Sequence, residues 1–198
     1  MRRQPDLTTR LGGWLFRRRT LVPLPFALAI LTLRAGQTPP SAALLAAGVA
    51  LTLAGEALRL WGVQHIGVVS RTRSDRLGPL VASGPFAYVR NPLYIGNIAV
   101  WVGFALTARL VWLAPVILVL LAAEYHAIVR WEEQLLAERI GNAYNDYLSR
   151  VPRWLPSRVA VPFAVSAPFA LSAALFSERG TLIAIAAGYL LLWTKARF

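Results

Sequence analysis

A short polar stretch at the start of an apolar run holds the side chains best suited to chemistry. Residues 83–96 contain an Arg, an Asn and two Tyr beside two Pro. The pairs Gly84-Pro85 and Asn91-Pro92 predict turns, because proline disfavours helix at the residue before it. Irregular polar backbone at membrane depth is tolerated only where protein covers it or where it lines a cavity. The stretch therefore predicts a binding or catalytic site at the mouth of a hydrophobic segment.

A second polar segment, residues 130–158, contains the acidic pair Glu132-Glu133. Apolar residues after the pair recur at helical spacing, which predicts an amphipathic helix over Val129–Ile140 that continues the preceding apolar run. Gly141 is a plausible C-cap of this helix. The aromatic side chains that follow, Tyr144, Tyr147 and Trp154, are interpreted as residues of the membrane interface.

The composition is that of a membrane protein. Hydrophobic residues make up 57% of the 198 residues, charged residues only 15%, and the mean hydropathy is +0.52. The formal charge of +12 comes from basic residues between apolar runs, which indicates anionic lipid head groups rather than nucleic acid as partners. Without Cys there is no disulfide or thiolate metal site, and His65 and His126 belong to no ligand-spaced cluster. No metal site is therefore expected.

The apolar runs predict an all-α fold, a polytopic transmembrane helical bundle formed by one integral-membrane domain over residues 1–198. The second and fourth runs approach the roughly 20 residues needed to cross the hydrocarbon core. The six runs are Leu21–Leu33, Ala42–Val63, Ile95–Leu106, Val111–Val129, Val159–Phe176 and Thr181–Trp193.

The basic residues predict the orientation. If the N-terminus is cytoplasmic and all six runs cross, 17 of the 21 Lys and Arg lie on the cytoplasmic side, Lys195 and Arg197 among them. Arg34, Arg109 and Arg179 fall on the other side, and Arg59 lies within a span. The polar segments 65–94 and 130–158 are then both cytoplasmic. A single Lys beside twenty Arg hints at a GC-rich bacterial genome, and hence at a bacterial inner membrane.

Together the two polar segments resemble a family of integral-membrane methyltransferases. These are the isoprenylcysteine carboxyl methyltransferases and the related phospholipid N-methyltransferases. The resemblance covers about residues 50–156, which would form the methyltransferase core, with 157–198 as additional C-terminal hydrophobic helices. The matching residues, in the order and spacing of the family, are Ser83-Gly84, Arg90-Asn91-Pro92-Leu93-Tyr94-Ile95-Gly96, Glu132-Glu133, Gly141, Tyr144, Tyr147 and Val151-Pro152.

The resemblance implies that S-adenosylmethionine binds in a cytoplasmic pocket between the 65–94 loop and the Glu-Glu helix. It also implies that a lipophilic small molecule, lipid or prenylated acceptor enters from the bilayer. Catalytic roles would belong to Arg90 and Glu132, and Arg130 and Arg153 would contact the acceptor. The residues expected to bind the cofactor are Leu80, Val81, Phe86, Asn91, Pro92, Leu93, Tyr94, Glu132 and Glu133.

Three departures from the family pattern leave the acceptor open. Asn91 stands where the family has His, Phe86 where it has Tyr, and Ile128 where the prenylcysteine enzymes have an Arg that faces the substrate carboxylate. Carboxyl O-methylation is the first interpretation. Methylation of an amine such as phosphatidylethanolamine is the second, and it needs a base or a water path because the amine must lose a proton. A non-catalytic scaffold or small transporter is an alternative of a different class.

Charged residues elsewhere have a structural interpretation. Glu56 and Arg59 lie three apart within the second run and are expected to pair on one helix face. Arg71, Arg73 and Arg76 are expected to face lipid head groups.

Overall fold

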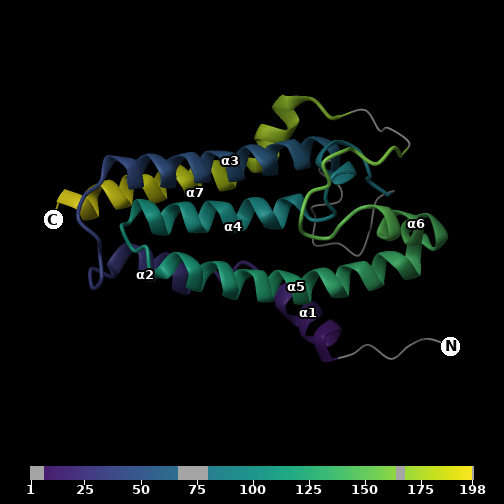
Figure 1. Cartoon of the computed structure of the whole chain (residues 1–198), viewed down its shortest axis with the longest axis horizontal. Coiled ribbons are helices and arrows are strands. Elements are labelled where there is room, and N and C mark those ends of the chain that lie inside the picture. The colour runs from purple at the N-terminus through teal and green to yellow at the C-terminus, as the bar shows by residue number, and fades with distance from the viewer. Residues whose placement is uncertain (1–6, 67–79, 164–167, 198) are drawn as a thin grey trace. The chain divides into compact units, whose positions relative to one another are not determined.

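The computed structural model describes residues 7–66, 80–163 and 168–197, and the regular elements within these ranges are helices, with no strand (Figure 1). The predicted all-α fold is confirmed. Arg71, Arg73 and Arg76 lie outside the described residues. The helices are α1 (Leu7–Arg18), α2 (Leu24–Thr32), α3 (Ala42–Ile66), α4 (Pro92–Thr107), α5 (Leu113–Ile140), α6 (Asn142–Arg150) and α7 (Leu171–Arg197), and Gly84–Ala87 forms the 3₁₀ turn η2.

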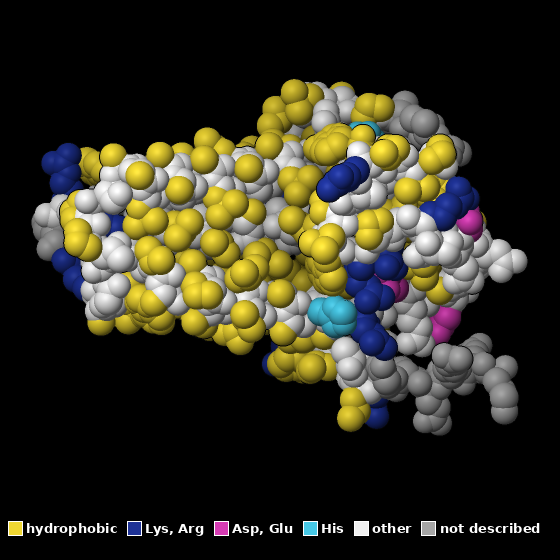
Figure 2. All heavy atoms as spheres, viewed as in Figure 1, with side chains coloured by type: hydrophobic (Ala, Val, Ile, Leu, Met, Phe, Trp, Pro, Cys, Tyr) yellow, Lys and Arg dark blue, Asp and Glu magenta, His cyan; other side chains and the backbone are white. Residues whose placement is uncertain are grey.

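Three helices are long and apolar enough to cross a membrane: α3 with 25 residues, α5 with 28 and α7 with 27. The apolar helix α4 has 16 residues. Each long helix exposes large hydrophobic side chains, for example Leu53 at 61%, Val119 at 64% and Ile183 at 67%. Hydrophobic side chains also dominate the face drawn in Figure 2. Such surfaces suit lipid, in which apolar side chains are favourably solvated.

Helix α5 bears out the prediction that the fourth apolar run continues into an amphipathic segment, since one helix covers Leu113–Ile140. Gly141 follows with φ +71°, a left-handed conformation that favours glycine. Its N–H donates to the carbonyl oxygen of Ala137 at 3.0 Å. Gly141 therefore ends α5 as the predicted C-cap.

The prediction of two spans after Arg158 is wrong, because the described residues there contain one helix, α7. Residues 159–163 and 168–170 are not helical, and α7 begins only at Leu171. Pro162 and Pro168 account for this, since proline removes a helical hydrogen bond and clashes with the preceding turn. The sequence Glu178-Arg179-Gly180, expected to separate two spans, lies inside α7. The first predicted span is also too long, because α2 has 9 residues and rises only about 14 Å.

The described chain divides into two compact units, each assembled from separate segments. The first unit comprises Met1–Ala54, Ile98–Gln134 and Ile185–Phe198; the second comprises Gly55–Asn97 and Leu135–Ala184. Helices α3, α4, α5 and α7 each contribute residues to both units. The grouping of 1–198 into one domain stays a prediction.

In the first unit, α3 and α4 approach closely at two glycines. A Cβ atom on Gly48 would lie 2.8 Å from the carbonyl oxygen of Gly103, and one on Gly103 would lie 2.6 Å from that of Gly48. Small residues allow such contact between membrane helices. The Tyr189 hydroxyl of α7 donates to Thr52 of α3 at 2.8 Å, which ties a third helix to this pair.

The end of α7 changes the expected distribution of basic residues. The Lys195 ammonium donates to the carbonyl oxygens of Ile30 and Leu33 at 2.7 and 2.6 Å. Arg34 in turn donates to the carbonyl oxygen of Lys195 at 3.4 Å. Lys195 therefore lies beside Arg34, not on the opposite side as predicted. The error has the same cause as the miscounted spans, since one helix rather than two leads to the C-terminus.

Candidate functional site

The motif turn, η2 (Gly84–Ala87) of the second unit, begins with a glycine that its surroundings require. Gly84 has φ +60°, and a Cβ atom there would lie 2.4 Å from the His65 ring. The N–H of Phe86 then donates to the carbonyl oxygen of Ser83 at 3.2 Å, which closes the first turn of η2. The Gly84-Pro85 turn expected from the sequence is thus present, and it is held against α3 through His65.

Several side chains expected to line the cofactor site pack instead against other residues of the protein. Phe86 is 7% exposed. A Cβ atom on Gly62 of α3 would lie 2.8 Å from Leu93 Cδ2 and 3.8 Å from Phe86 Cε2, so both side chains pack on this glycine. Pro92, which begins α4, is fully buried. These residues hold the turn to α3, whereas the half-buried Val81 retains exposed surface.

Two motif segments that are about 60 residues apart in sequence are hydrogen-bonded to each other. The Arg90 N–H donates to the carbonyl oxygen of Pro152 at 2.9 Å. The side-chain amide of Asn91 donates to the carbonyl oxygen of Arg153 at 3.1 Å. These contacts between residues 90–91 and residues 152–153 form a joint between the two motif segments. Asn91, in the place of the family His, donates a hydrogen bond across this joint. The predicted acceptor residue Arg153 takes part through its backbone, and Arg90, Asn91, Tyr94 and Arg153 are all half-buried.

The joint continues along the chain beyond Arg153. The Ser157 N–H donates to the carbonyl oxygen of Tyr88 at 2.9 Å, and the Val161 N–H donates to that of Ala87 at 3.0 Å. The non-helical segment after α6 thus runs beside the motif turn and satisfies its backbone carbonyls. This satisfies the requirement that irregular backbone in a buried setting find hydrogen-bond partners.

The tyrosines of α6 form the core beneath the motif turn. Tyr144 and Tyr147 are 4% and 3% exposed, and their ring centroids lie 5.9 Å apart. The Tyr147 hydroxyl donates to the carbonyl oxygen of Phe86 at 2.9 Å. Leu80, expected to line the cofactor, packs against this same cluster. The interpretation of these tyrosines as interface residues is therefore wrong, because tertiary packing buries them.

An exposed ion pair lies on the outer face of α6. Arg150 Nε donates to Asp146 Oδ1 at 3.0 Å, and the hydrogen bond from Arg150 lowers the pKa of the Asp146 carboxyl. The same guanidinium lies 4.6 Å from the centre of the Phe163 ring. Arg150 therefore joins α6 to the segment that follows it.

The acidic pair belongs to the first unit, on α5. Glu133 is buried, Glu132 is half-buried and Arg130 is exposed. Ile128, at the position of the family Arg, is fully buried, so this position offers no polar surface to an acceptor. The association of the Glu-Glu helix with the 65–94 loop around a cofactor stays a prediction.

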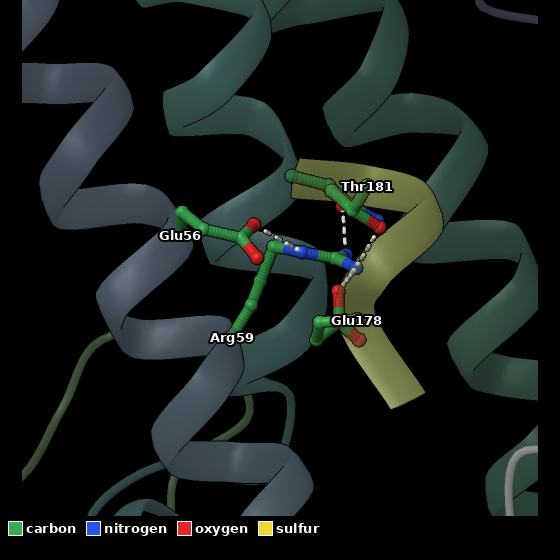
Figure 3. A network of polar contacts seen from close by, with 5 residues as sticks. Glu56, Arg59, Glu178 and Thr181 are labelled. Carbon is green, nitrogen blue, oxygen red and sulfur yellow. Dashed lines mark hydrogen bonds and ion pairs between the residues drawn. The ribbon is translucent and has the colours of Figure 1, made fainter. Parts of the chain in front are cut away.

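A buried polar cluster in the second unit extends the predicted Glu56–Arg59 pair, in which Arg59 Nε lies 3.1 Å from Glu56 Oε2 (Figure 3). The pair is confirmed. Arg59 also contacts Asn97 of α4 and both Glu178 and Thr181 of α7. Sequence reasoning missed Glu178 because it was assigned to a loop. A lone carboxylate within an apolar segment was the signal that could have identified it.

Within the described part of the chain, no three His, Cys, Asp or Glu side chains are grouped so that they could hold a metal ion. The expectation that there is no metal site stays a prediction.

Two curated bacterial proteins are similar to this chain. A nickel-cobalt-cadmium resistance protein, NccN of Alcaligenes xylosoxydans xylosoxydans, is 31% identical over 116 residues, 59% of this chain and 51% of the relative. A cobalt-zinc-cadmium resistance protein, CzcN of Cupriavidus metallidurans, is 28% identical over 109 residues, 55% of this chain and 46% of the relative. The chain thus spans about half the length of these relatives.

No solved structure matches the chain significantly. The family model described as phospholipid methyltransferase matches residues 43–143. That range includes the motif turn, the start of α4 and the acidic pair of α5, and it covers half of the chain. The family assignment therefore agrees with the resemblance noted in the motifs. The chain belongs to the phospholipid methyltransferase family of integral-membrane methyltransferases.

Proposed function

We propose that this protein transfers a methyl group from S-adenosylmethionine to a lipophilic acceptor. One observation carries the proposal: the family motif segments around Arg90–Asn91 and Pro152–Arg153 meet through hydrogen bonds of 2.9 and 3.1 Å within one unit. Buried irregular backbone needs hydrogen-bond partners in any fold, but here the partners are two segments that both carry family motif residues. Their contact holds those residues in a defined geometry, as a binding site requires.

The side chains at the joint suit the chemistry of the cofactor. S-adenosylmethionine carries a carboxylate, an ammonium, a sulfonium and an adenine. The half-buried Arg90 guanidinium is suited to the carboxylate, and Tyr94 and Val81 offer aromatic and apolar surface to the adenine. The family pattern assigns Glu132 and Glu133 to the ammonium or ribose groups, and this part of the proposal rests on sequence.

The cofactor, when bound, supplies an electrophilic methyl group for an in-line displacement. A carboxylate acceptor is already a nucleophile, so the protein needs only to orient it and to exclude water. An amine acceptor must first lose a proton to a base. We favour a carboxylate acceptor, held by a cation other than one at position 128, with Arg130 and Arg153 as the candidates.

Calorimetry with S-adenosylmethionine on the detergent-purified protein tests cofactor binding. We expect saturable binding that Tyr94→Ala and Glu132→Ala each weaken about tenfold, which corresponds to roughly 1.4 kcal/mol. The matched control is Glu138→Ala, which removes an exposed carboxylate from the same helix. Unchanged affinity in both test variants would refute the site assignment, and absence of binding to the wild type would refute the proposed function.

A radiolabelled-methyl assay identifies the acceptor class. It compares a prenylcysteine analogue, phosphatidylethanolamine and a water-soluble thioether acid with a similar head group. We expect a lipophilic acceptor to react at least about tenfold faster than the soluble acid. Equal rates would contradict entry from the bilayer.

The alternative acceptor is the amine of phosphatidylethanolamine, and the phospholipid methyltransferase family assignment supports it. The same assay decides between the two, since preference for the amine would make it the substrate. Methyl transfer to neither class, despite cofactor binding, would favour a third acceptor.

The names of the relatives suggest a physiological test. Esterification of a carboxylate removes an anionic ligand for divalent cations, so methylation at the membrane surface would lower metal binding there. We propose that loss of the protein reduces growth in nickel, cobalt or cadmium. Complementation by wild type but not by Tyr94→Ala would support this, and complementation by both would separate metal tolerance from methyl transfer.

A further inference from the structure

Arg59 lies at the centre of a buried set of contacts with residues of α3, α4 and α7 in the second unit. Figure 3 labels the members of this set on α3 and α7. Arg59 is 7% exposed, Glu56 is 5% and Glu178 is completely buried. A buried guanidinium is unfavourable unless it is paired and hydrogen-bonded, and here both conditions are met. Such a set is retained in an apolar setting only when it has a structural or functional use.

Each nitrogen of the guanidinium has a separate partner. Nε donates to Glu56 Oε2 at 3.1 Å, and Nη1 donates to the Asn97 side-chain oxygen. Nη2 donates to the Glu178 carboxylate and to the Thr181 hydroxyl, the latter at 3.1 Å. Because the guanidinium is planar and rigid, these contacts fix its orientation relative to α3, α4 and α7 together.

The contact with Asn97 connects this set to the motif. Asn97 lies three residues after Tyr94 and four after Leu93, so all three belong to the first turns of α4. Gly96, next to it, packs on the Arg59 stem: a Cβ atom there would lie 2.6 Å from Arg59 Cγ. Arg59 thus contacts α4 at two successive residues, Gly96 and Asn97.

The partners on α7 lie beyond the residues that match the family model. That match ends at residue 143, whereas Glu178 and Thr181 are near the start of α7. This helix exposes much of its apolar surface and contributes no motif residue. The role of its polar contacts with Arg59 is therefore not explained by the family motifs.

We propose that Glu178 and Thr181 are positioning residues of the methyltransferase. Through Arg59 and Asn97, they hold the first turn of α4 in the orientation that lets Tyr94 and its neighbours bind S-adenosylmethionine. This inference rests on the proposed function. It assigns to α7 a role in cofactor affinity that the family motifs do not contain.

A variant that separates positioning from stability is Glu56→Leu/Arg59→Met/Glu178→Leu. Apolar residues of similar volume often replace a buried ion pair without loss of stability. We expect this protein to unfold within a few degrees of the wild type. We also expect its dissociation constant for S-adenosylmethionine to rise at least about tenfold. Wild-type affinity in the folded variant would overturn the proposal.

Single substitutions keep the test decisive if the triple variant does not fold. Asn97→Leu removes the hydrogen bond from Arg59 to α4 but leaves the Arg59–Glu178 pair. Thr181→Val removes a hydroxyl, whereas Thr181→Ser retains it. We expect weaker cofactor binding in the first two and near wild-type binding in the third. The matched control is Thr107→Val at the far end of α4, an isosteric change of a buried hydroxyl. Equal effects of Asn97→Leu and Thr107→Val would contradict a specific role for Asn97.

Hydrogen exchange provides a readout that does not depend on the cofactor. In Asn97→Leu and Glu178→Gln, the backbone amides of residues 95–97 should exchange several-fold faster, while those of α6 keep their wild-type rates. Uniformly faster exchange would indicate a general loss of stability, and unchanged exchange would show that Arg59 does not hold α4. If the wild type binds no S-adenosylmethionine, the proposed function fails, and this exchange pattern still decides whether the contacts position α4.

Discussion

Tyr147 donates a hydrogen bond from its hydroxyl to the carbonyl oxygen of Phe86, 2.9 Å away and buried beneath the motif turn. Tyr147→Phe leaves this carbonyl without its donor, which typically costs about 1–3 kcal/mol. We expect a lower melting temperature and weaker binding of S-adenosylmethionine, measured by thermal unfolding and calorimetry. The matched control, Tyr189→Phe, loses the 2.8 Å bond to Thr52 in the first unit. It should lower stability while keeping cofactor affinity, and equal losses of affinity would contradict a local role for Tyr147.

Glycines provide a paired test of helix packing. Gly103→Ala inserts a methyl group 2.3 Å from Thr52 Oγ1 and 2.6 Å from the Gly48 carbonyl oxygen. Overpacking of this kind typically costs about 1–3 kcal/mol. Gly180→Ala on α7 meets nothing within 4 Å and should stabilise the helix by roughly 0.5–1 kcal/mol. Thermal unfolding in detergent measures both, and a neutral Gly103→Ala would show that α3 and α4 separate easily.

The continuity of α7 predicts on which side of the membrane its flanking residues lie. Since the described residues between Arg158 and Leu171 are not helical, α7 is expected to be the single crossing after α5. Arg158→Cys and Ala196→Cys, introduced separately into this cysteine-free chain, should react with an impermeant maleimide from opposite sides. Labelling of both from the same side would restore the two-span arrangement expected from hydropathy.

The orientation itself is tested at α6. Asn145 is exposed, and the excess of Arg in segment 130–158 predicts that it is cytoplasmic. In a bacterial host, Asn145→Cys should therefore not react with an impermeant maleimide while the cells are intact. It should react once the membrane has been opened. Labelling from outside the intact cell would reverse the proposed orientation.

The Asp146–Arg150 pair predicts a pH dependence of stability. The hydrogen bond from Arg150 lowers the pKa of the folded-state carboxyl. A group with a lowered folded-state pKa stabilises the fold above its unfolded pKa of about 3.9 and loses this contribution as the pH falls through the folded value. Asp146→Asn should therefore lower the melting temperature slightly at pH 7, and this difference should shrink as the pH falls below the unfolded pKa. A difference that grows on acidification would contradict this sign.

The sequence by itself determined the class of fold, the family and the limits of several elements. Apolar runs of sufficient length must lie in lipid as helices, so the all-α fold followed from composition and periodicity. Gly141 ended α5 as expected, because a left-handed residue is a local requirement that the chain must meet with glycine. The Glu56–Arg59 pair also followed from spacing, since residues three apart share a helix face.

Only the tertiary structure decided which residues far apart in the sequence contact and bury one another. Hydropathy cannot distinguish two short spans from one helix that carries a charged residue, so it divided α7 at Glu178. Only the buried Arg59 of another helix shows how that carboxylate is accommodated. Likewise, Tyr144 and Tyr147 have the composition of interface residues, and only the chain folded over them makes them core. Helices and caps depend on neighbours in sequence, whereas the burial of a polar side chain depends on the partner that compensates it, which can lie anywhere in the chain.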